Sequence, residues 1–325
     1  MRRLFGEDTV PEGPEGGRPA AVLIAGPTAS GKSALALALA RAFDGVVINT
    51  DSMQVYADLR VLTARPSPAE EAQAPHRLYG SIDGAVNFSV GHFQRQAAAI
   101  LAEADAAGRL PIFVGGTGLY FRALDEGLSD LPEVPEAIRE AGRAEAEGQP
   151  TEALHALLAA RDPGSAARLR PSDRMRVMRA LEIFAATGRP IGSFHDSREP
   201  GPLTGRTLLK IFLSVEREEL RRRIDARFLA MMQAGALDEV AALREKNLDP
   251  LLPVMRAHGV PGLIAHLDGA LSLDEAIQRG QGDTRRYAKR QHTWFRHQMG
   301  AGWHWLGPDE ARAFAINRLS APAGR

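Results

Sequence analysis

The feature that most constrains the fold is a short apolar run followed by a glycine-rich turn and a helix-forming segment. The apolar run covers residues 21–25, and the segment 33–43 is dense in Ala and Leu, with Leu35 and Leu39 four residues apart. A continuous apolar run of this length is typical of a buried parallel strand, and the four-residue spacing favours a helix. The chain therefore begins its folded part with a strand–turn–helix unit.

The turn in this unit has the sequence of a phosphate-binding loop. Residues 26–33 read G-P-T-A-S-G-K-S, which matches G-x-x-x-x-G-K-[ST] in the strand-to-helix context that the motif requires. Glycines let the backbone approach phosphate oxygens, and N–H groups at a helix start face the anion. Lys32 would bind the terminal phosphates, and the Ser33 hydroxyl would be a ligand of Mg²⁺. The expected phosphate-binding residues are Gly26, Pro27, Thr28, Ala29, Ser30, Gly31, Lys32 and Ser33.

Strands and helices continue to alternate after the loop. Apolar runs predict further strands at 45–50, 110–114 and 209–215 and a short last strand at 303–306, and residues 90–107 predict an Ala-rich helix. Strands separated by helices imply right-handed crossovers and a parallel sheet. We therefore expect an α/β fold of the P-loop NTPase-like type, with a parallel sheet flanked by helices and ligands at the carboxyl ends of the strands.

The pattern changes to helices alone between about 130 and 200. Helices are predicted at 135–147, 151–160 and 174–187, separated by Gly- and Pro-containing breaks. We expect an all-helical insertion domain in an α/β core. The predicted divisions are a flexible leader over 1–19, the core over 20–130 and 201–310, the insertion over 131–200, and a C-terminal tail over 311–325.

Composition excludes several kinds of protein. The chain has no cysteine, which excludes disulfides, cysteine nucleophiles and thiolate zinc sites. Lys+Arg and Asp+Glu both number 40, so any surface that binds nucleic acid must be a local basic patch. No apolar run reaches the roughly 18 residues of a membrane span, and the leader lacks the apolar centre of a signal peptide. We expect a cytoplasmic monomer without a membrane partner.

Polar residues follow the second and third predicted strands. Asp51 begins the segment D-S-M-Q-V-Y, and an Asp near a phosphate site can accept a proton or orient an amine, although it is also a common helix cap. Thr117, in G-G-T-G-L-Y, could hydrogen-bond a departing diphosphate oxygen or simply cap a turn. No acid follows the run 110–114, where a nucleotide hydrolase usually holds Mg²⁺, and this weakens an ATPase interpretation without excluding it.

Two arginine-rich segments predict helices with basic faces. The segment 283–298 places cations on two adjacent stripes, which suits phosphate contacts, although most such runs are solvated surface helices. The first stripe holds Arg285, Lys289, His292 and Arg296, and the second holds Arg286, Arg290 and His297. The other cluster is Arg221, Arg222, Arg223 and Arg227, on a helix whose apolar face is Leu220, Ile224 and Phe228.

Together, the three motifs resemble those of the bacterial tRNA dimethylallyltransferases. The motifs G-P-T-A-S-G-K-S, D-S-x-Q-x-Y and G-G-T-x-L-Y occur in the family's order, and the resemblance extends over about 20–308. The further matching segments are T-A-R-P at 63–66, P-H-R-L at 75–78, R-x-x-R-A-L-E at 176–182, R-I-x-x-R-F at 223–228, and A-K-R-Q at 288–291 followed by Trp294.

The resemblance implies an activity and a set of site residues. The family transfers dimethylallyl from dimethylallyl diphosphate to N6 of adenosine-37, beside the anticodon of tRNA, and releases diphosphate. By this resemblance Asp51 is the general base for the adenine amine, Thr117 assists the bridging oxygen, and Arg223 reaches the diphosphate, which the loop holds with Mg²⁺. The implied contacts to the tRNA anticodon loop are Asp51, Ser52, Met53, Gln54, Arg139, Met175, Arg176, Val177, Met178 and Arg179. From the basic stripes of 283–298 we add Arg286, Lys289 and Arg290.

Two departures from the family pattern and two alternative functions remain. Leu62 stands where the family usually has Gly, and G-V-P-G at 259–262 stands where G-Y-[RK]-[EQ] is usual. The second departure removes a polar pair and puts a tRNA or core contact near 259–262 in question. The alternatives are a small-molecule or nucleoside kinase with a helical lid, which predicts ATP turnover without RNA, and a non-catalytic P-loop RNA-binding protein.

Overall fold

The computed structural model describes residues 18–194, 198–300 and 302–321, and it divides into two compact units. The core unit contains the chain up to Asp125 and from Pro202 onward, and the helical unit contains Glu126–Gly201. The predicted leader therefore lies outside the described residues, except for its last two positions. Within the described residues, no helix combines the length and the apolar character needed to cross a bilayer.

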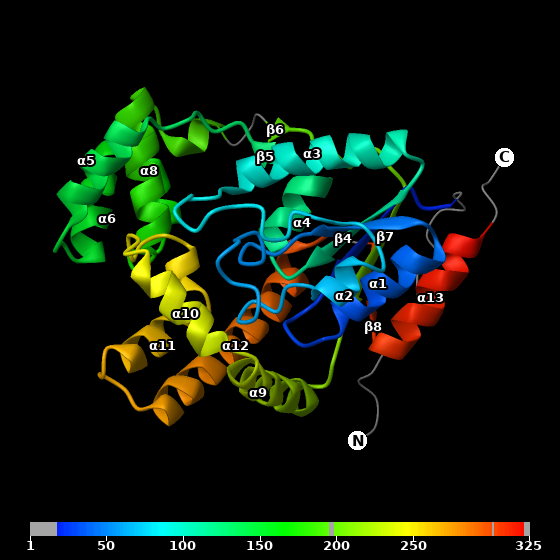
Figure 1. Cartoon of the computed structure of the whole chain (residues 1–325). Helices are drawn as coiled ribbons and strands as arrows, with labels where there is room; N and C mark the ends of the chain where they lie inside the picture. Colours follow the sequence, from blue (N-terminus) through cyan, green and yellow to red (C-terminus); the bar gives the residue numbers. More distant parts are fainter. Residues whose placement is uncertain (1–17, 195–197, 301, 322–325) are drawn as a thin grey trace, which may run out of the picture. The chain divides into compact units, whose positions relative to one another are not determined.

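The core unit is built on a six-stranded sheet in which every pairing is parallel, as predicted (Figure 1). The strand order is β3-β2-β4-β1-β7-β8, so β1 lies between β4 and β7. The strands are β1 Ala21–Ala25, β2 Gly45–Asn49, β3 His76–Arg77, β4 Leu110–Gly115, β7 Leu208–Leu213 and β8 Trp303–Leu306. Strand β3 was not predicted, because two residues are too few to show a pattern.

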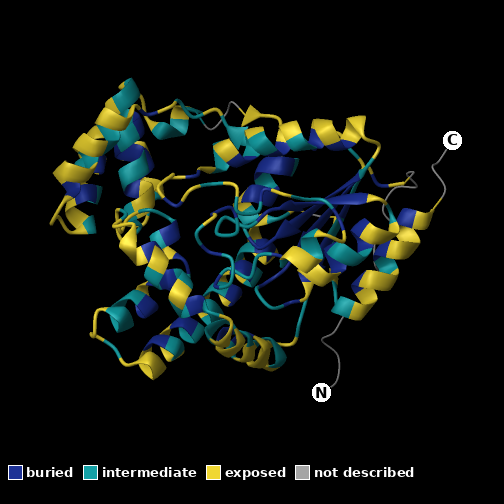
Figure 2. Cartoon of the chain, in the orientation of Figure 1, coloured by how far each residue is buried: buried dark blue, intermediate teal, exposed yellow. Residues whose placement is uncertain are grey.

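Helices cover both faces of this sheet, since its strands are apolar on both sides (Figure 2). On one face, Leu23 and Ile48 pack with α3 Val90–Ala106, α4 Gly118–Asp125 and α12 Leu273–Gln298. The same hydrophobic cluster includes residues of α9 Arg217–Gln233, α10 Ala236–Glu245, the short helix η2 Val254–Arg256 and α11 Val260–Leu267. The one-turn helix α2 Pro68–Glu71 follows β2.

The other face of the sheet packs against α1 Lys32–Ala42 and α13 Pro308–Ser320. Helix α13 corrects the predicted C-terminal tail over 311–325. Its buried residues Ala311, Ala315 and Leu319 are four positions apart, so they form one apolar stripe that packs with Leu35 and Leu213. Alanine-rich stripes carry a weak apolar signal, and this is why the helix was missed.

The helical unit has its own small core. Its helices are α5 Glu136–Ala146, α6 Thr151–Arg161, α7 Pro163–Arg168 and α8 Arg174–Thr187, followed by the short helix η1 Ile191–Phe194. The prediction that this unit is all-helical is wrong, because β5 Leu128–Ser129 pairs antiparallel with β6 Arg198–Glu199. These two-residue strands are exposed or half-buried and give no alternating pattern. Pairing with β6 also moves the start of the unit to Glu126, ahead of the predicted residue 131.

Candidate active site

The glycine-rich turn between β1 and α1 leaves backbone N–H groups free at the start of a helix. Gly31 precedes α1 with φ of +93° and offers no side chain to cap it. A Cβ added at Gly31 would meet no atom within 4 Å, so the space beside the turn is open. The N–H groups of the first helical turn and the positive helix end therefore face a free space, which is the arrangement that binds phosphate.

Two buried polar side chains in this turn are suited to an anion. Lys32 is 9% exposed, and its Nζ donates a hydrogen bond of 3.3 Å to the Pro27 carbonyl. Burial lowers the pKa of Lys32 to about 8, and the charge of Asp51 opposes this shift. The Ser30 hydroxyl is fully buried and lacks a partner within the described part of the chain. An oxyanion in this turn would satisfy both groups.

Asp51 lies directly after β2, and Asn49 fixes its backbone. The Asn49 side chain accepts the Asp51 N–H at 2.8 Å and donates to the Asp51 carbonyl at 2.9 Å. Asp51 Oδ1 accepts the Met53 N–H at 2.9 Å, whereas Oδ2 has no hydrogen bond or ion pair to any residue that the structure describes. The structure therefore confirms the capping role for one oxygen of Asp51, and it leaves the other oxygen without a partner among the described residues, so that the role as a base stays a prediction.

Residues after Asp51 are held within their own loop. Met53 is half-buried and packs against the core. The Gln54 side-chain nitrogen donates to the carbonyl oxygens of Thr63 at 2.8 Å and Ala64 at 3.1 Å. Both N–H groups of the Gln54 amide are thus used, so the tRNA contact predicted for Gln54 would have to be made by its amide oxygen.

Thr117 lies in the turn between β4 and α4, beside Ser52. Its Oγ1 accepts the Ser52 N–H at 3.0 Å and lies 3.3 Å from the Ser52 hydroxyl oxygen. The Thr117 N–H donates to the Thr50 carbonyl at 3.2 Å. Because β2 and β4 are neighbours in the sheet, these bonds join the segments that follow both strands. Thr117 and Asp51 consequently belong to one corner of the sheet's carboxyl edge.

Gln291, on α12, links this corner to the phosphate loop and was given no role from the sequence. It is 4% exposed, donates through Nε2 to the Gly116 carbonyl at 3.0 Å, and accepts the Thr28 N–H at 3.1 Å. Gln291 belongs to the A-K-R-Q segment, so the resemblance drew attention to its position. Its contacts could not be predicted, because 263 residues separate it from Thr28.

Two arginines of α9 differ in their surroundings. Arg223 is largely exposed on α9, and its Nε donates at 2.7 Å to Glu219 of the same helix. Arg227, one turn later, is partly buried, and it interacts electrostatically with Asp51 and Lys32. Arg227 is therefore a further candidate to reach the diphosphate, and the role predicted for Arg223 stays a prediction. In a run of several arginines, the sequence does not reveal which one faces inward.

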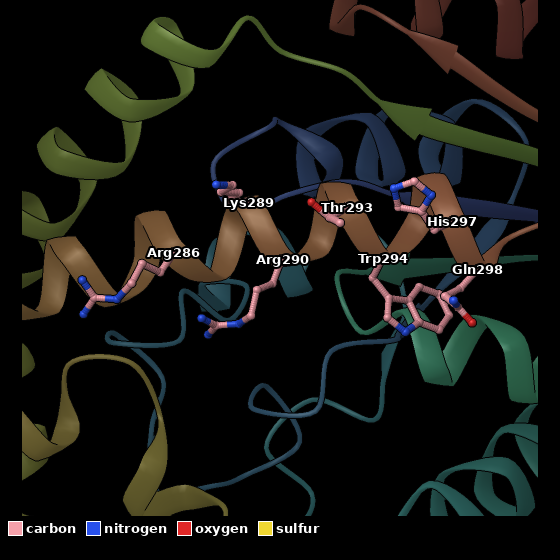
Figure 3. Close-up of a pocket in the computed structure, with 7 residues that line it drawn as sticks. All are labelled: Arg286, Lys289, Arg290, Thr293, Trp294, His297 and Gln298. Atoms are coloured by element: carbon pink, nitrogen blue, oxygen red, sulfur yellow. The ribbon is translucent and has the colours of Figure 1, made fainter. Parts of the chain in front are cut away.

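A basic pocket of about 640 Å³ runs along α12 (Figure 3). Arg286 pairs with Asp283, whereas no carboxylate in the described part of the chain pairs with Lys289 or Arg290. The cations expected to contact tRNA thus extend from one stretch of helix, and two of them are free to bind phosphate. The lining residues are Arg286, Lys289, Arg290, Thr293, Trp294, His297 and Gln298.

The other predicted stripe of α12 is only partly available to RNA. Arg285 pairs with Asp225 of α9 at 2.5 Å, and the His292 ring packs edge-on against Phe212 and Trp305, with centroids 5.9 and 5.3 Å apart. Both side chains are thus engaged in contacts between α12, α9 and the sheet. One side of the helix is therefore packed into the core unit, and the exposed side carries the basic surface.

In the helical unit, the residues predicted to contact tRNA lie on α5 and α8. On α5, Arg139 lies 3.9 Å from Glu136. On α8, Met175 is 72% exposed, whereas Val177 is fully buried in the helical core. The prediction of a tRNA contact is therefore wrong for the Val177 side chain, because successive helical residues face different directions. The remaining predicted residues on α8 are Arg176, Met178 and Arg179.

Both departures from the family pattern have structural roles. Leu62 is buried and does not have a positive φ, and its N–H donates to Glu239 at 2.9 Å, so a side chain is tolerated there. Gly259, with φ of +100°, precedes α11, and Val260 is buried in the core. The segment 259–262 therefore starts a packed helix.

Comparisons with known proteins identify the relatives of this chain. A family model described as IPP transferase matches residues 54–298, and a model described as Zeta toxin matches residues 7–70. A tRNA dimethylallyltransferase of Methylorubrum extorquens (strain PA1) is 78% identical over 97% of this chain and 99% of its own length. Another, from Rhodopseudomonas palustris (strain ATCC BAA-98 / CGA009), is 61% identical over 94% of this chain and 96% of its own length.

Solved structures show the same fold. A tRNA isopentenylpyrophosphate transferase from Bacillus halodurans is 34% identical, with a TM-score of 0.66 over 92% of this chain and 96% of its own. A eukaryotic dimethylallyltransferase acting on tRNA is 29% identical, with a TM-score of 0.72 over 85% of this chain and 69% of its own. The P-loop α/β fold predicted from the sequence is thereby confirmed, and these relatives support the prenyltransferase over the kinase.

Proposed function

We infer, from the premise that this chain belongs to the tRNA dimethylallyltransferase family, that it transfers a dimethylallyl group from dimethylallyl diphosphate to N6 of adenosine-37 in tRNA. The observation that carries the assignment of its site is the meeting of three groups at one edge of the sheet. These groups are the phosphate loop, the free Asp51 oxygen and the Thr117 hydroxyl. Together they match a reaction in which an amine displaces a diphosphate.

The loop would act on the leaving group. In the reaction the adenine N6 forms a bond with C1 of the donor, while the bond between C1 and the bridging oxygen breaks and diphosphate leaves. Charge develops on that oxygen, so fixed positive groups around it lower the barrier. Lys32, the first-turn N–H groups of α1, Arg227 and the Thr117 hydroxyl are the groups that we assign to this task.

Asp51 would act on the nucleophile. The amine must lose a proton as the new bond forms, and the free Oδ2 is suited to accept it, while Oδ1 keeps the turn in place. Orientation is a second contribution, because an aromatic amine reacts only when it lies in line with the breaking bond. Asn49 holds the Asp51 backbone from both sides and so fixes the carboxylate.

The residues at the loop also fit Mg²⁺. Ser33 is the second residue of α1, in the first turn of the helix, and offers one hydroxyl. No group of three His, Asp or Glu side chains able to hold a metal is found among the described residues. Such a site suits Mg²⁺, which often binds through one protein ligand, substrate phosphates and water. When bound, the ion would neutralise charge on the departing diphosphate, and Ser33 would be its protein ligand.

The tRNA would be held by phosphate contacts. A base in the anticodon loop must be turned out of its stack to reach a donor site, and this requires a firm hold on the neighbouring backbone. Lys289 and Arg290 are cations without a carboxylate partner on the basic pocket of α12, and they are the strongest candidates among the described residues of the core unit. We propose that they bind phosphates of the anticodon loop.

Two Asp51 variants test this assignment. Asp51→Asn keeps an oxygen for the Met53 N–H but removes the base, so we expect kcat to fall by roughly 10²–10⁴-fold with little change in melting temperature. Asp51→Ala should lose both functions and melt earlier. The assay is transfer of radiolabel from dimethylallyl diphosphate to unmodified tRNA, with ATP turnover followed in parallel. A kcat for Asp51→Asn within threefold of the wild type would show that Asp51 serves only as a cap.

A further inference from the structure

Gln291 of α12 joins two loops at the carboxyl edge of the sheet. Strands β1 and β4 are neighbours, and beyond their ends the chain continues as the phosphate loop and as the turn 116–118. The buried side chain of Gln291 lies between these two segments. Its oxygen accepts the Thr28 N–H at 3.1 Å, and its nitrogen donates to the Gly116 carbonyl at 3.0 Å. One amide therefore holds the loop and the turn together.

The chemistry of the two partners requires an amide at this position. Thr28 offers an N–H and Gly116 offers a carbonyl oxygen, so the side chain between them must accept on one side and donate on the other. An amide does both at once, whereas an ionised carboxylate only accepts and an aliphatic side chain does neither. The partners also fix which way round the amide lies, because turning it over would set donor against donor and acceptor against acceptor. Gln291 is thus held in one orientation.

In the phosphate loop, Gln291 holds the peptide group that faces Lys32. The Thr28 N–H and the Pro27 carbonyl belong to one planar trans peptide unit, so they point to opposite sides. Gln291 binds the N–H, and the carbonyl on the other side accepts from Lys32 Nζ at 3.3 Å. The next residue, Ala29, has a φ of +66°, which a residue with a side chain adopts only when its surroundings support it. Gln291 therefore fixes the part of the loop that places the Lys32 ammonium.

In the turn 116–118, Gln291 lies directly against a glycine next to Thr117. A Cβ added at Gly116 would lie 1.9 Å from the Gln291 nitrogen, so only glycine lets the two groups approach. Three residues further along α12, the Trp294 ring lies against Gly118, where an added Cβ would be 2.0 Å away. The helix thus contacts the residues before and after Thr117, and the hydrogen bond from Gln291 sets the distance of the turn from the loop.

We propose that Gln291 is a positioning residue for the transfer reaction, which keeps the phosphate loop and the Thr117 turn at the spacing that the diphosphate requires. The inference rests on the function proposed above, in which the loop binds the diphosphate and Thr117 donates to its bridging oxygen. Alignment matters because a displacement of about 1 Å at a reacting centre can cost on the order of 100-fold in rate. Gln291 acts through the loop and the turn, since both polar ends of its amide are engaged within the protein.

Two variants remove the bridge made by the amide. Gln291→Met keeps an unbranched side chain that neither donates to Gly116 nor accepts from Thr28, and Gln291→Asn keeps the amide but is one methylene too short to reach both partners. We expect kcat for label transfer to fall by roughly 10- to 100-fold in both variants. KM for tRNA should stay within about twofold of wild type, because Lys289 and Arg290 remain on the same helix (Figure 3). An equal rise in KM for tRNA would mean that α12 had shifted as a whole, and it would contradict the positioning role.

The matched control is Gln281→Met on the same helix. Gln281 is half-buried, and its side-chain nitrogen donates at 3.1 Å to the Asp225 carbonyl of α9, so its bond joins two helices. Losing that bond should lower the melting temperature and leave kcat unchanged, because the loop and the turn keep their link. Equal falls in kcat for Gln281→Met and Gln291→Met would show a general loss of packing and would exclude a specific role of Gln291.

A double-mutant cycle shows whether the effect passes through Thr117. In a Thr117→Val background the hydroxyl to be aligned is absent, so adding Gln291→Met should lower kcat by a smaller factor than in the wild type. Equal factors in the two backgrounds would overturn the inference. A wild-type chain that transferred no label to tRNA would overturn the proposed function as well, whereas label transfer at the wild-type rate by Gln291→Met would overturn this inference alone.

Discussion

Lys32 carries the charge that we assign to donor binding, and its surroundings make that charge costly before the donor arrives. It is almost completely buried, its only hydrogen bond among the described residues is to the Pro27 carbonyl, and its pKa is lowered to about 8. A diphosphate would reverse this effect, because a neighbouring anion stabilises the ammonium. Binding above pH 8 must therefore take up a proton.

The pH dependence of donor affinity follows from this shift. Below about pH 8 Lys32 is charged in the free and the bound protein, so affinity is constant with respect to this group. Above pH 8 the free protein loses the proton, and affinity should fall by up to roughly tenfold per pH unit. Calorimetry at pH 7, 8 and 9, in buffers of different ionisation enthalpy, measures both affinity and proton uptake.

A matched variant shows whether Lys32 is the group responsible. Lys32→Met keeps an unbranched side chain of similar length without the charge, so it should bind the donor weakly and without proton uptake between pH 7 and 9. If Lys32→Met retained the pH slope of the wild type, the titrating group would be another residue.

At the scale of elements, α12 joins the parts of the site, and its glycines show how closely it is packed. Gly280 lies against the ring of Phe228 on α9, where an added Cβ would stand 2.2 Å from the ring. Gly282, two residues later on the same helix, has only the ends of flexible arginine side chains nearby, the nearest at 3.4 Å. The two positions have the same helix propensity but opposite packing requirements.

Alanine at these two positions should therefore have opposite effects. Ala gains about 1 kcal/mol over Gly inside a helix, so Gly282→Ala should stabilise the protein. Gly280→Ala gains the same propensity but overpacks the contact with Phe228, at a cost of roughly 1 to 3 kcal/mol, so its net effect should be neutral to destabilising. Urea unfolding with an unchanged m-value measures both. Equal stabilisation by the two variants would contradict the close contact between α9 and α12.

At the scale of the whole molecule, the formal net charge is zero, but the charged side chains are unevenly distributed over the surface. Lys289 and Arg290 lie on the basic pocket without carboxylate partners among the described residues, whereas many other arginines are paired along their own helices, as Arg222 and Arg223 are with Glu219. Affinity for RNA should thus depend on a few local cations and fall steeply with salt, even in a neutral protein.

Charge reversal tests where the RNA-binding surface lies. Lys289→Glu with Arg290→Glu should raise KM for tRNA and reduce the slope of log K against log salt by about 0.7 to 0.9 for each tRNA phosphate that the variant no longer binds. The control is Arg312→Glu with Arg318→Glu, on exposed positions of α13, which changes the net charge equally. A comparable rise in KM for both pairs would mean that net charge, and not the α12 surface, governs tRNA binding.

The local sequence determined those features that depend on neighbours in the chain. The continuous apolar runs β1, β2, β4 and β7 predicted a parallel sheet, because strands buried on both faces must be apolar throughout. The strand–turn–helix context of the phosphate loop was predicted, because it resides in one backbone turn and the start of one helix. Asp51 and Thr117 were found for a related reason: they directly follow strands whose ends must meet at one edge.

Only the tertiary structure decided which side chains complete the site. Arg227 proved to be partly buried near Asp51, Val177 turned inward, and Gln291 reached the turn after β4 from a helix more than 160 residues away in the chain. Each of these outcomes depends on the rotation of a helix about its axis when it packs, and neighbouring residues of similar chemistry carry no signal for it. The sequence thus determined the edge of the sheet at which we place the reaction. Helix packing determined which further side chains lie at that edge.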